Sequence, residues 1–323
     1  MVQRPWKQGI EARRRNRLAN GDGSTDAADH MLYDISLKIT YSYEIPVSGG
    51  RHIVRVLPLS LPSRQRLIAG TITCLPLPEE RTDTQDFFAN PSTTILFRKL
   101  HDALVIHMKA RVELQPAMPT ADLSPDLALF PAEIGAVWSL DPGSPHHFLA
   151  ASPRLAEDPT IAAYARSMVK PGMTVRQIAG LLCERIYKDF TYDPKATSVD
   201  TTPIEAFRLK KGVCQDFAHI MIVALRSLGI PAGYVSGFLR TLPPPGKERL
   251  EGADAMHAWV RAWCGNTLGW IELDPTNNVP AGTDHIVVAH GRDYSDVAPV
   301  IGILKSYGSH KTDQAVDVVP VDA

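Results

Sequence analysis

Hydrophobic and polar residues alternate through the first part of the chain. Between residues 31 and 116 the period is two, as at Ile35, Leu37 and Ile39 and again over residues 104–108, with Gly, Pro and Ser between the runs. Successive side chains of a strand point to opposite faces, so this pattern predicts half-buried antiparallel strands. The region has room for about five to seven strands, which is enough for a small antiparallel β-sandwich domain.

A different pattern begins after residue 155. Apolar residues recur three and four positions apart in "EDPTIAAYARSMVK", "TVRQIAGLLCERIYKDF" and "KKGVCQDFAHIMIVALRSLGIP", which predicts helices. Alternation returns in "AGYVSGFL", "HAWVRAW", "GWIELDP", "HIVVAHG" and "VAPVIGIL". We therefore expect an α+β core over residues 156–320, with the proline-rich residues 117–155 as the connection to the β domain. Residues 1–30 are polar and lack periodicity, so we expect a disordered tail there.

Composition excludes some classes of partner and cofactor. The chain has 323 residues and a formal net charge of -1, so no strong field would attract nucleic acid or an anionic membrane. Its four cysteines are scattered without a CxxC pair, which argues against a zinc cluster or a redox dithiol, and we expect no metal and no cofactor. Residues 1–30 lack the apolar core of a secretory signal, so we expect a cytoplasmic protein in a reducing compartment.

Cys214 stands where a helix is predicted to begin. Gly212 and Val213 precede it, the apolar spacing continues to Leu228, and Gly229 starts a helix-stop signal. In the first turn of a helix the unpaired N–H groups and the positive end of the dipole favour a thiolate, and they can stabilise an oxyanion. The alternative is that Cys214 is a small hydrophobic residue on a core-facing side of the helix.

A histidine and an aspartate fall on two strands that form a predicted hairpin. Residues 257–263 and 270–274 both alternate, and Gly265-Asn266 between them suits a tight two-residue turn. In that register His257 lies directly opposite Asp274, so the carboxylate can hold one imidazole nitrogen while the other faces a nucleophile. A longer loop could shift the register, and a shift of one residue would turn the two side chains apart.

Other interpretations of these polar residues stay open. Asp254 and Glu272 compete with Asp274 as the partner of His257, although Asp254 precedes the strand and Glu272 pairs two positions further away. His257 and Asp274 can also be read as polar residues at strand ends, with Asp274 starting a turn before a proline. The three residue types needed for nucleophilic catalysis nevertheless occur together, which favours an enzyme.

Three motifs resemble those of the transglutaminase-like superfamily. They are "GVCQDFAHIMIVALRSLGIPAGYVSGF", "MHAWV" and "GWIELDPTN", which carry a cysteine, a histidine and an aspartate in the order of that family. The segment "IYKDFTYDPKATSVDTTPIEAF" resembles its bacterial branch, and "YDISLKITYSYEIPVSGGRHIVRVLPLS" is similar to the β domain that precedes the core in that branch. The resemblance extends over roughly residues 31–320. One departure is Met256, where many relatives have a small polar residue.

The resemblance implies a papain-like α+β core in which Cys214 attacks an amide carbonyl, His257 transfers protons and Asp274 orients His257, as in a cysteine protease. The N–H of Cys214 is one candidate oxyanion donor. The further candidates for oxyanion or pocket roles are Tyr192, Gln215, Asp216 and Trp259. Tyr192 can equally be an aromatic core residue, and Gln215 and Asp216 can serve in capping or positioning the helix.

These observations lead to two hypotheses of different class. In the first, the protein cleaves or transfers the acyl group of a peptide or protein amide through a thioester on Cys214, and we favour hydrolysis over transfer. In the second, it is a binding or scaffold protein in which the three residues are idle. The oligomeric state is not indicated by the sequence.

Overall fold

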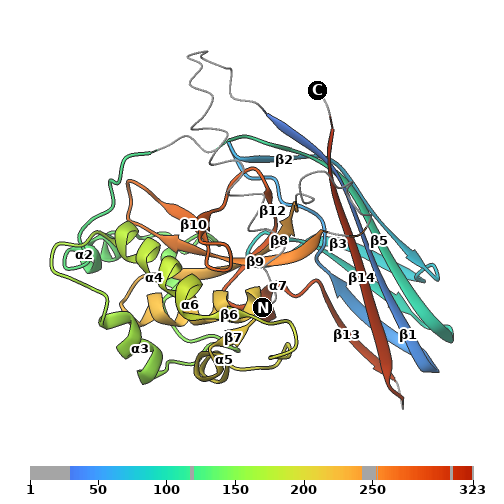
Figure 1. Cartoon of the computed structure of the whole chain (residues 1–323). Helices are drawn as coiled ribbons and strands as arrows, with labels where there is room; N and C mark the ends of the chain where they lie inside the picture. The colour runs from blue at the N-terminus through green and yellow to red at the C-terminus, as the bar shows by residue number, and fades with distance from the viewer. Residues whose placement is uncertain (1–29, 117–119, 242–251, 253, 306–307, 322–323) are drawn as a thin grey trace, which may run out of the picture.

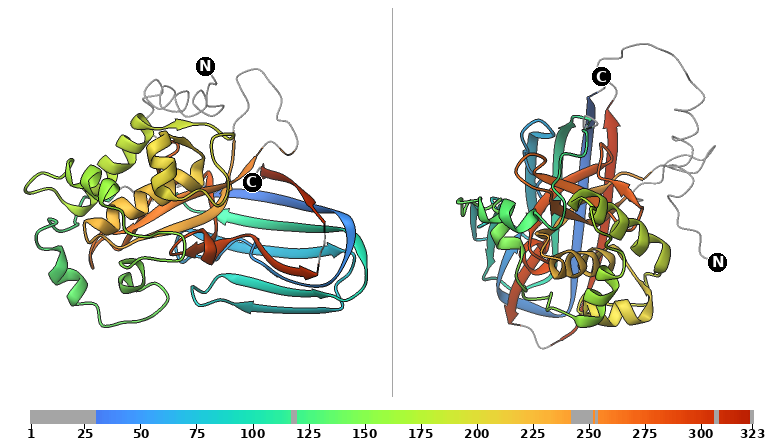
Figure 2. Two further views of the ribbon diagram at one scale, coloured as in Figure 1. Left: turned by 90° about the horizontal axis from the view of Figure 1, so that it is seen from below. Right: turned by 90° about the vertical axis from the view of Figure 1, so that its left-hand side faces the viewer.

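The computed structural model describes residues 30–116, 120–241, 252, 254–305 and 308–321. Figure 1 shows the helices gathered on one side of the molecule and long strands on the other, with a second sheet between them, and Figure 2 shows the same arrangement from two further directions. The protein is therefore a mixed α and β structure with an N-terminal β domain beside a core of helices and sheet. The tail predicted for residues 1–30 lies outside the described residues except for His30.

The β domain consists of antiparallel strands, as its period-two pattern predicts. Its strands from the N-terminal part of the chain are β1 (Met31–Val54), β2 (Gln65–Leu75), β3 (Glu80–Gln85), β4 (Pro91–Phe97) and β5 (His101–Leu114). The first part of β1 pairs with β5 and the second part with β4, so one long strand serves two parts of the sheet. Ile35, Leu37 and Ile39 are buried as expected.

Two further strands of this sheet come from the C-terminal end of the chain. They are β13 (Val300–Lys305) and β14 (His310–Val321). β14 pairs with β1 from Leu32 opposite Val321 to Tyr43 opposite His310, and β13 pairs with the second part of β1. The prediction that the core continues to residue 320 is therefore wrong. Alternation identifies a strand and its inward face, but it does not specify which strand lies beside it.

The core packs helices on one side of a separate antiparallel sheet. The main helices are α3 (Pro159–Arg166), α4 (Val175–Asp189), α5 (Pro203–Leu209) and α6 (Cys214–Ser227). The sheet has the order β11-β10-β9-β8-β12. Its strands are β8 (Ala232–Leu239), β9 (Ala255–Trp263), β10 (Trp270–Asp274), β11 (Val279–Pro280) and β12 (His285–Gly291). α6 lies against β9 and β8 and is buried from Asp216 to Leu225, which makes it the central helix of the core.

Shorter elements connect these layers. They are α2 (Phe130–Gly135), the 3-10 helix η1 (Pro145–Phe148), β6 (Thr191–Tyr192), β7 (Lys211–Gly212) and α7 (Tyr294–Val297). β6 and β7 pair in parallel immediately before α6. Among the described residues, no helix is long and apolar enough to cross a membrane.

Polar side chains join the β domain to the core. The buried Gln65 side chain donates to the carbonyls of Leu59 and Val287, each at 2.7 Å, and accepts from the N–H of Val287 at 2.8 Å. Arg64 donates to Glu272 at 2.8 Å. A buried amide that bonds to backbone on both sides requires a defined approach of the two parts, because each bond has a narrow range of length and angle.

Candidate active site

The predicted start of α6 at Cys214 is confirmed. Val213 precedes the helix in extended conformation, and Oδ2 of the buried Asp216 accepts from the N–H of Val213 at 2.8 Å and from Thr197 Oγ1 at 2.6 Å. Burial raises the pKa of Asp216, and these two hydrogen bonds partly oppose the rise. A Cβ at Gly212 would lie 2.4 Å from Asp216 Oδ2, so the close approach of chain and carboxylate requires glycine there.

Cys214 differs from the other cysteines in exposure. The thiols of Cys74, Cys183 and Cys264 are buried, whereas Cys214 is partly exposed. Burial raises the pKa of Cys264 to about 12, and it raises the pKa of Cys183 well above the ordinary value, as expected for a core thiol. Buried thiols with raised pKa values are poor nucleophiles, so Cys214 is the thiol that a reagent or substrate can reach.

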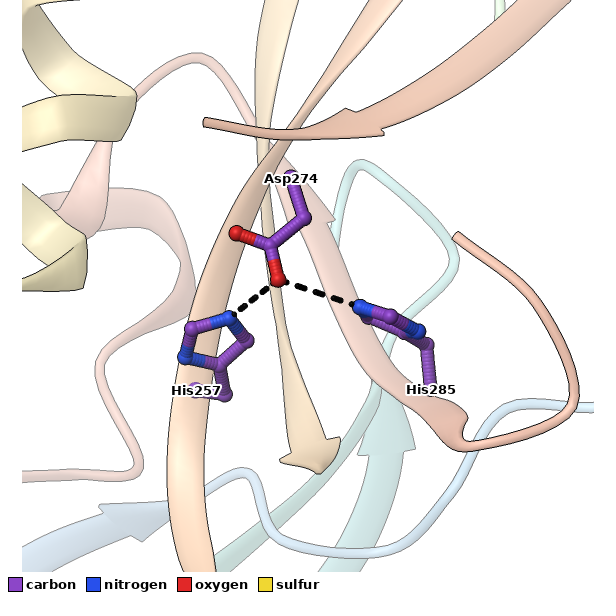
Figure 3. Close-up of side chains that lie close together, drawn as sticks. All are labelled: His257, Asp274 and His285. Carbon is purple, nitrogen blue, oxygen red and sulfur yellow. Dashed lines mark hydrogen bonds and ion pairs between the residues drawn. The ribbon is translucent and has the colours of Figure 1, made fainter. Parts of the chain in front are cut away.

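His257 links Cys214 to Asp274. The ring is on β9, which lies against α6, and its Nε2 is 2.8 Å from Asp274 Oδ2 (Figure 3). The other ring nitrogen, Nδ1, is then the one that can meet the thiol. Burial by itself lowers the pKa of His257, but the charge of Asp274 and the charge and hydrogen bond of Cys214 outweigh it and raise the pKa to about 10. The imidazolium is therefore the favoured form of this ring at neutral pH.

Asp274, the last residue of β10, has no exposed surface. Its Oδ1 accepts from the N–H of Thr276 at 2.9 Å and of Asn277 at 3.2 Å, and its Oδ2 accepts from Asn277 Nδ2 at 2.6 Å in addition to the histidine. Burial raises the pKa of Asp274, but the opposite effect of the two histidines that face the carboxylate is larger. The net pKa therefore lies well below the ordinary value. The carboxylate is thus ionised and held on both oxygens.

The predicted register of the hairpin is wrong by two residues. Trp263 faces Trp270 and Val260 faces Leu273, so His257 and Asp274 are diagonal neighbours rather than directly opposed. A shift of two residues keeps every side chain on its predicted face, because the period of a strand is two. The predicted contact between the two side chains is therefore present although the pairing that suggested it is not.

The cause is a longer loop than the predicted Gly265-Asn266 turn. The N–H of Cys264 donates to the carbonyl of Gly269 at 2.7 Å, and both Gly265 and Gly269 have positive φ. Asn266 bonds instead to Glu133 on α2 through its N–H at 3.0 Å and its Nδ2 at 2.9 Å. Contact with another element thus outweighed the local preference for a tight turn.

The two alternative carboxylates are engaged elsewhere. Asp254 accepts from the N–H of Thr241 at 2.6 Å and of Val318 at 2.7 Å, so it fixes β14 beside the start of β9. Glu272 pairs with Arg64 and accepts from the indole N–H of Trp259. Of the three predicted candidates, Asp274 is therefore the one that bonds His257.

The remaining predicted residues lie around this group in different roles. Tyr192, on β6, pairs with Gly212, and burial together with the charge of Cys214 raises its pKa to about 12. Gln215 Nε2 donates to the carbonyl of Val199 at 2.9 Å. Trp259 is fully buried and stacks on His257 with 6.1 Å between ring centroids, so its indole packs against the imidazole ring. Of these three side chains, Tyr192 is the one whose pKa responds to the charge of Cys214.

Sequence reasoning missed two residues of the site. His285, the first residue of β12, is 5% exposed, and its Nε2 lies 3.2 Å from Asp274 Oδ2. Tyr234, on β8, is buried, and burial together with the charge of Cys214 raises its pKa well above the ordinary value. "HIVVAHG" and "AGYVSGFL" indicate strands, but their alternation carries no information on which side chains meet across the sheet.

The side chains of His257, Asp274 and His285 also form a group that could hold a metal ion, since their donor atoms lie within 4.8 Å of one another. Both Nε2 atoms are directed at Asp274 Oδ2, as Figure 3 shows, at hydrogen-bond distances of 2.8 and 3.2 Å. Asn277 Nδ2 donates to the same oxygen. Metal ligands converge on a common point between them, whereas these donors converge on an acceptor, so the contacts are those of hydrogen bonds.

Comparisons with known proteins agree with the observed architecture. Residues 162–275 match the model of the transglutaminase-like superfamily, and residues 33–113 match that of the bacterial transglutaminase-like N-terminal region. An uncharacterized protein of Mycobacterium tuberculosis is 37% identical over 265 residues, covering 80% of this chain and 83% of that protein. A protein-glutamine gamma-glutamyltransferase of Pseudomonas aeruginosa is 35% identical over 105 residues, 32% of this chain and 16% of that protein.

A solved structure has the same fold over nearly the whole chain. It is a protein of Cytophaga hutchinsonii named "Putative Cysteine Protease", with a TM-score of 0.70, 23% identity and coverage of 92% of each chain. The predicted combination of an N-terminal β domain with a core of this fold is thereby confirmed.

Proposed function

The chain belongs to the transglutaminase-like superfamily, and we propose that it is a cysteine-dependent enzyme acting on peptide or protein amides, with Cys214 as nucleophile, His257 as general base and acid, and Asp274 as the orienting carboxylate. The superfamily includes cysteine-dependent acyl transferases and protease-like members. The observation that supports the proposal is the hydrogen bond of 2.8 Å between His257 and the fully buried Asp274, together with the charge and hydrogen bond of the partly exposed Cys214 that help to raise the pKa of His257.

The reaction begins from the state in which the Cys214 proton rests on His257, so that a thiolate faces an imidazolium. The thiolate attacks the amide carbonyl, a C–S bond forms, and the carbonyl oxygen becomes an oxyanion near the first N–H groups of α6. The imidazolium then gives its proton to the leaving amine as the C–N bond breaks, which produces a thioester. Attack by water or by a second amine, whose proton passes to His257, releases the acyl group and restores the thiol.

We favour hydrolysis over transfer to an amine. Water is always present at the thioester and needs no binding site of its own, whereas transfer requires a pocket that presents an amine and keeps water away. Nucleophile, base and carboxylate serve both reactions equally, so the acceptor site decides between them.

Intact-mass analysis with a panel of glutamine-containing and ordinary peptides, with and without a primary amine, tests the proposal. A covalent adduct that is lost in Cys214→Ala supports the nucleophile, and cleavage or deamidation without amine incorporation supports hydrolysis. Incorporation of the amine would move the assignment to transglutaminase. Turnover undiminished in Cys214→Ala would refute the mechanism, and neither adduct nor turnover across the panel would favour the idle scaffold.

A further inference from the structure

His285 and His257 share one carboxylate although their strands are separated in the sheet. β8 and β9 lie between β12, which carries His285, and β10, which carries Asp274. Gly237 on β8, the residue opposite His257, has no space for a side chain, because a Cβ there would lie 2.1 Å from the carbonyl oxygen of Ile286 on β12 and 2.4 Å from the Trp259 ring. Because Gly237 has no side chain, the indole of Trp259 can lie directly against β8.

The Trp259 ring supports both imidazoles. His257 stacks on it with an angle of 30° between ring planes, and His285 meets it edge-on at 5.2 Å and 79°. Both Nε2 atoms then point to Asp274 Oδ2 (Figure 3). Packing against Trp259 and the hydrogen bond to Asp274 thus both fix the position of the His285 ring.

The proton on His285 has a defined position. The N–H of Gly282 donates to His285 Nδ1 at 3.3 Å, so Nδ1 offers its lone pair and the ring carries its proton on Nε2. His285 therefore donates to Asp274. Backbone N–H groups of Thr276 and Asn277 hold Oδ1, while the side chains of His285 and Asn277 donate to Oδ2 beside His257.

We propose that His285 is a positioning residue of this site, which holds Asp274 in the orientation that His257 needs and shares part of its negative charge. The inference rests on the proposed function, since a positioning role has meaning only if Cys214 and His257 react. Without the His285 donor, Asp274 is freer to turn about its side-chain bonds, and its charge acts more fully on the imidazolium of His257. The expected consequences are slower turnover and loss of the His257 proton at a higher pH than in the wild type.

Other titratable groups face the same site from neighbouring elements. The Cys214 thiol of α6 faces His257, the Cys183 thiol of α4 lies within reach of the charge of Asp274, and Tyr234 of β8 lies near Cys214. The pH dependence of the site therefore reflects several interacting groups together. A change in the pH profile between variants is informative, whereas a single step of the profile does not belong to one residue.

Two amide substitutions separate the contact with Asp274 from simple packing. The amide nitrogen of His285→Gln can reach the position of Nε2 and donate to Asp274, whereas the shorter His285→Asn places its amide near the position of Nδ1. The full chain of each variant is alkylated with iodoacetamide across the pH range, modification of Cys214 is followed by intact mass, and turnover is measured on the peptide substrate found for the wild type. Thermal unfolding of each variant serves as the stability control.

For Asn we expect about a ten-fold lower kcat with little change in KM, and a shift of the alkaline step of the alkylation profile upward by about half a pH unit. Gln should restore most of the turnover and leave that step in place. Asn that matches the wild type in both measurements, or Gln that deviates as far as Asn, would overturn the inference. Equal losses of stability and activity in both variants with no pH shift would show a structural role and also overturn it.

Failure of the proposed function gives a different result. If Cys214 of the wild type is alkylated no faster than the buried thiols, the function and the positioning role fall together. If it is alkylated rapidly and the Asn substitution changes nothing, only the role of His285 falls. Should the Asn variant not fold, histidine ¹⁵N spectra of the wild type, assigned against the Gln variant, decide: a proton on Nε2 supports the inference, and a proton on Nδ1 overturns it.

Discussion

Replacement of Asp274 by asparagine removes a charge while keeping the shape of the side chain. In the wild type Oδ2 accepts from His257, His285 and Asn277 at 2.8, 3.2 and 2.6 Å. An asparagine can keep an oxygen toward the backbone N–H groups, but its amide nitrogen then faces these three donors. His257 can accommodate it only by accepting at Nε2, which puts its proton on Nδ1, toward Cys214. A ring in that tautomer cannot remove the thiol proton.

The structure sets the size of the effect. The pKa of His257 rises from 6.5 to about 10 against the opposing effect of burial, which corresponds to on the order of 5 kcal/mol in favour of the imidazolium, shared between Asp274 and Cys214. Without the carboxylate, burial is opposed by Cys214 alone, so the pKa of His257 falls. We expect kcat to fall by about 10³- to 10⁴-fold, with some activity retained because Cys214 and the oxyanion donors remain.

Stability gives a second measurement with a defined sign. The pKa of Asp274 is lowered in the folded state, so its contribution is present above the ordinary value of 3.8 and is lost at lower pH. The pKa of His257 is raised, so its contribution is complete below 6.5 and declines as pH rises toward about 10. The advantage of the wild type over Asp274→Asn in urea unfolding should therefore be largest between these two ordinary values and smaller at pH 9.

The assay is turnover on the peptide found by mass analysis, combined with urea unfolding at pH 5.5 and pH 9. Asp274→Ala is the companion variant, because it removes the charge without introducing a competing donor. Wild-type turnover in Asp274→Asn, or a stability difference that grows from pH 5.5 to pH 9, would refute the electrostatic reasoning.

Three further predictions concern the start of α6. Alkylation of the native protein should give a single adduct at Cys214, absent in Cys214→Ala; adducts of equal yield in that variant would contradict the exposure argument. Gly212→Ala should cost about 2 kcal/mol in urea unfolding because its Cβ meets Asp216, whereas Gly180→Ala, with nothing within 4 Å, should not; equal effects would exclude the clash. Tyr192→Phe should lower kcat by about ten-fold or more with little change in KM if the hydroxyl stabilises the oxyanion, and unchanged kcat would assign it to packing.

Local signals predicted the start of α6 because the physical causes are local. Gly212 before Cys214 and the stop signal at Gly229 predicted a helix from Cys214 to Leu228, and the helix runs from Cys214 to Ser227 with Gly229 at positive φ. The inward and outward faces of the strands could be predicted equally well, since each face depends only on the alternation of residues within its own strand. For that reason His257 and Asp274 were expected on one face, and they remain there despite the longer hairpin loop.

By itself, then, the sequence determined the helix that presents Cys214, the strands and their faces, and the common face of His257 and Asp274. Only the tertiary structure decided that β14 returns to pair with β1 and that His285 reaches Asp274 across two strands. Periodicity gives the direction of a side chain relative to its own strand, but contacts between distant segments depend on sheet order, on the space left at Gly237 and on the packing of Trp259, which no local pattern encodes.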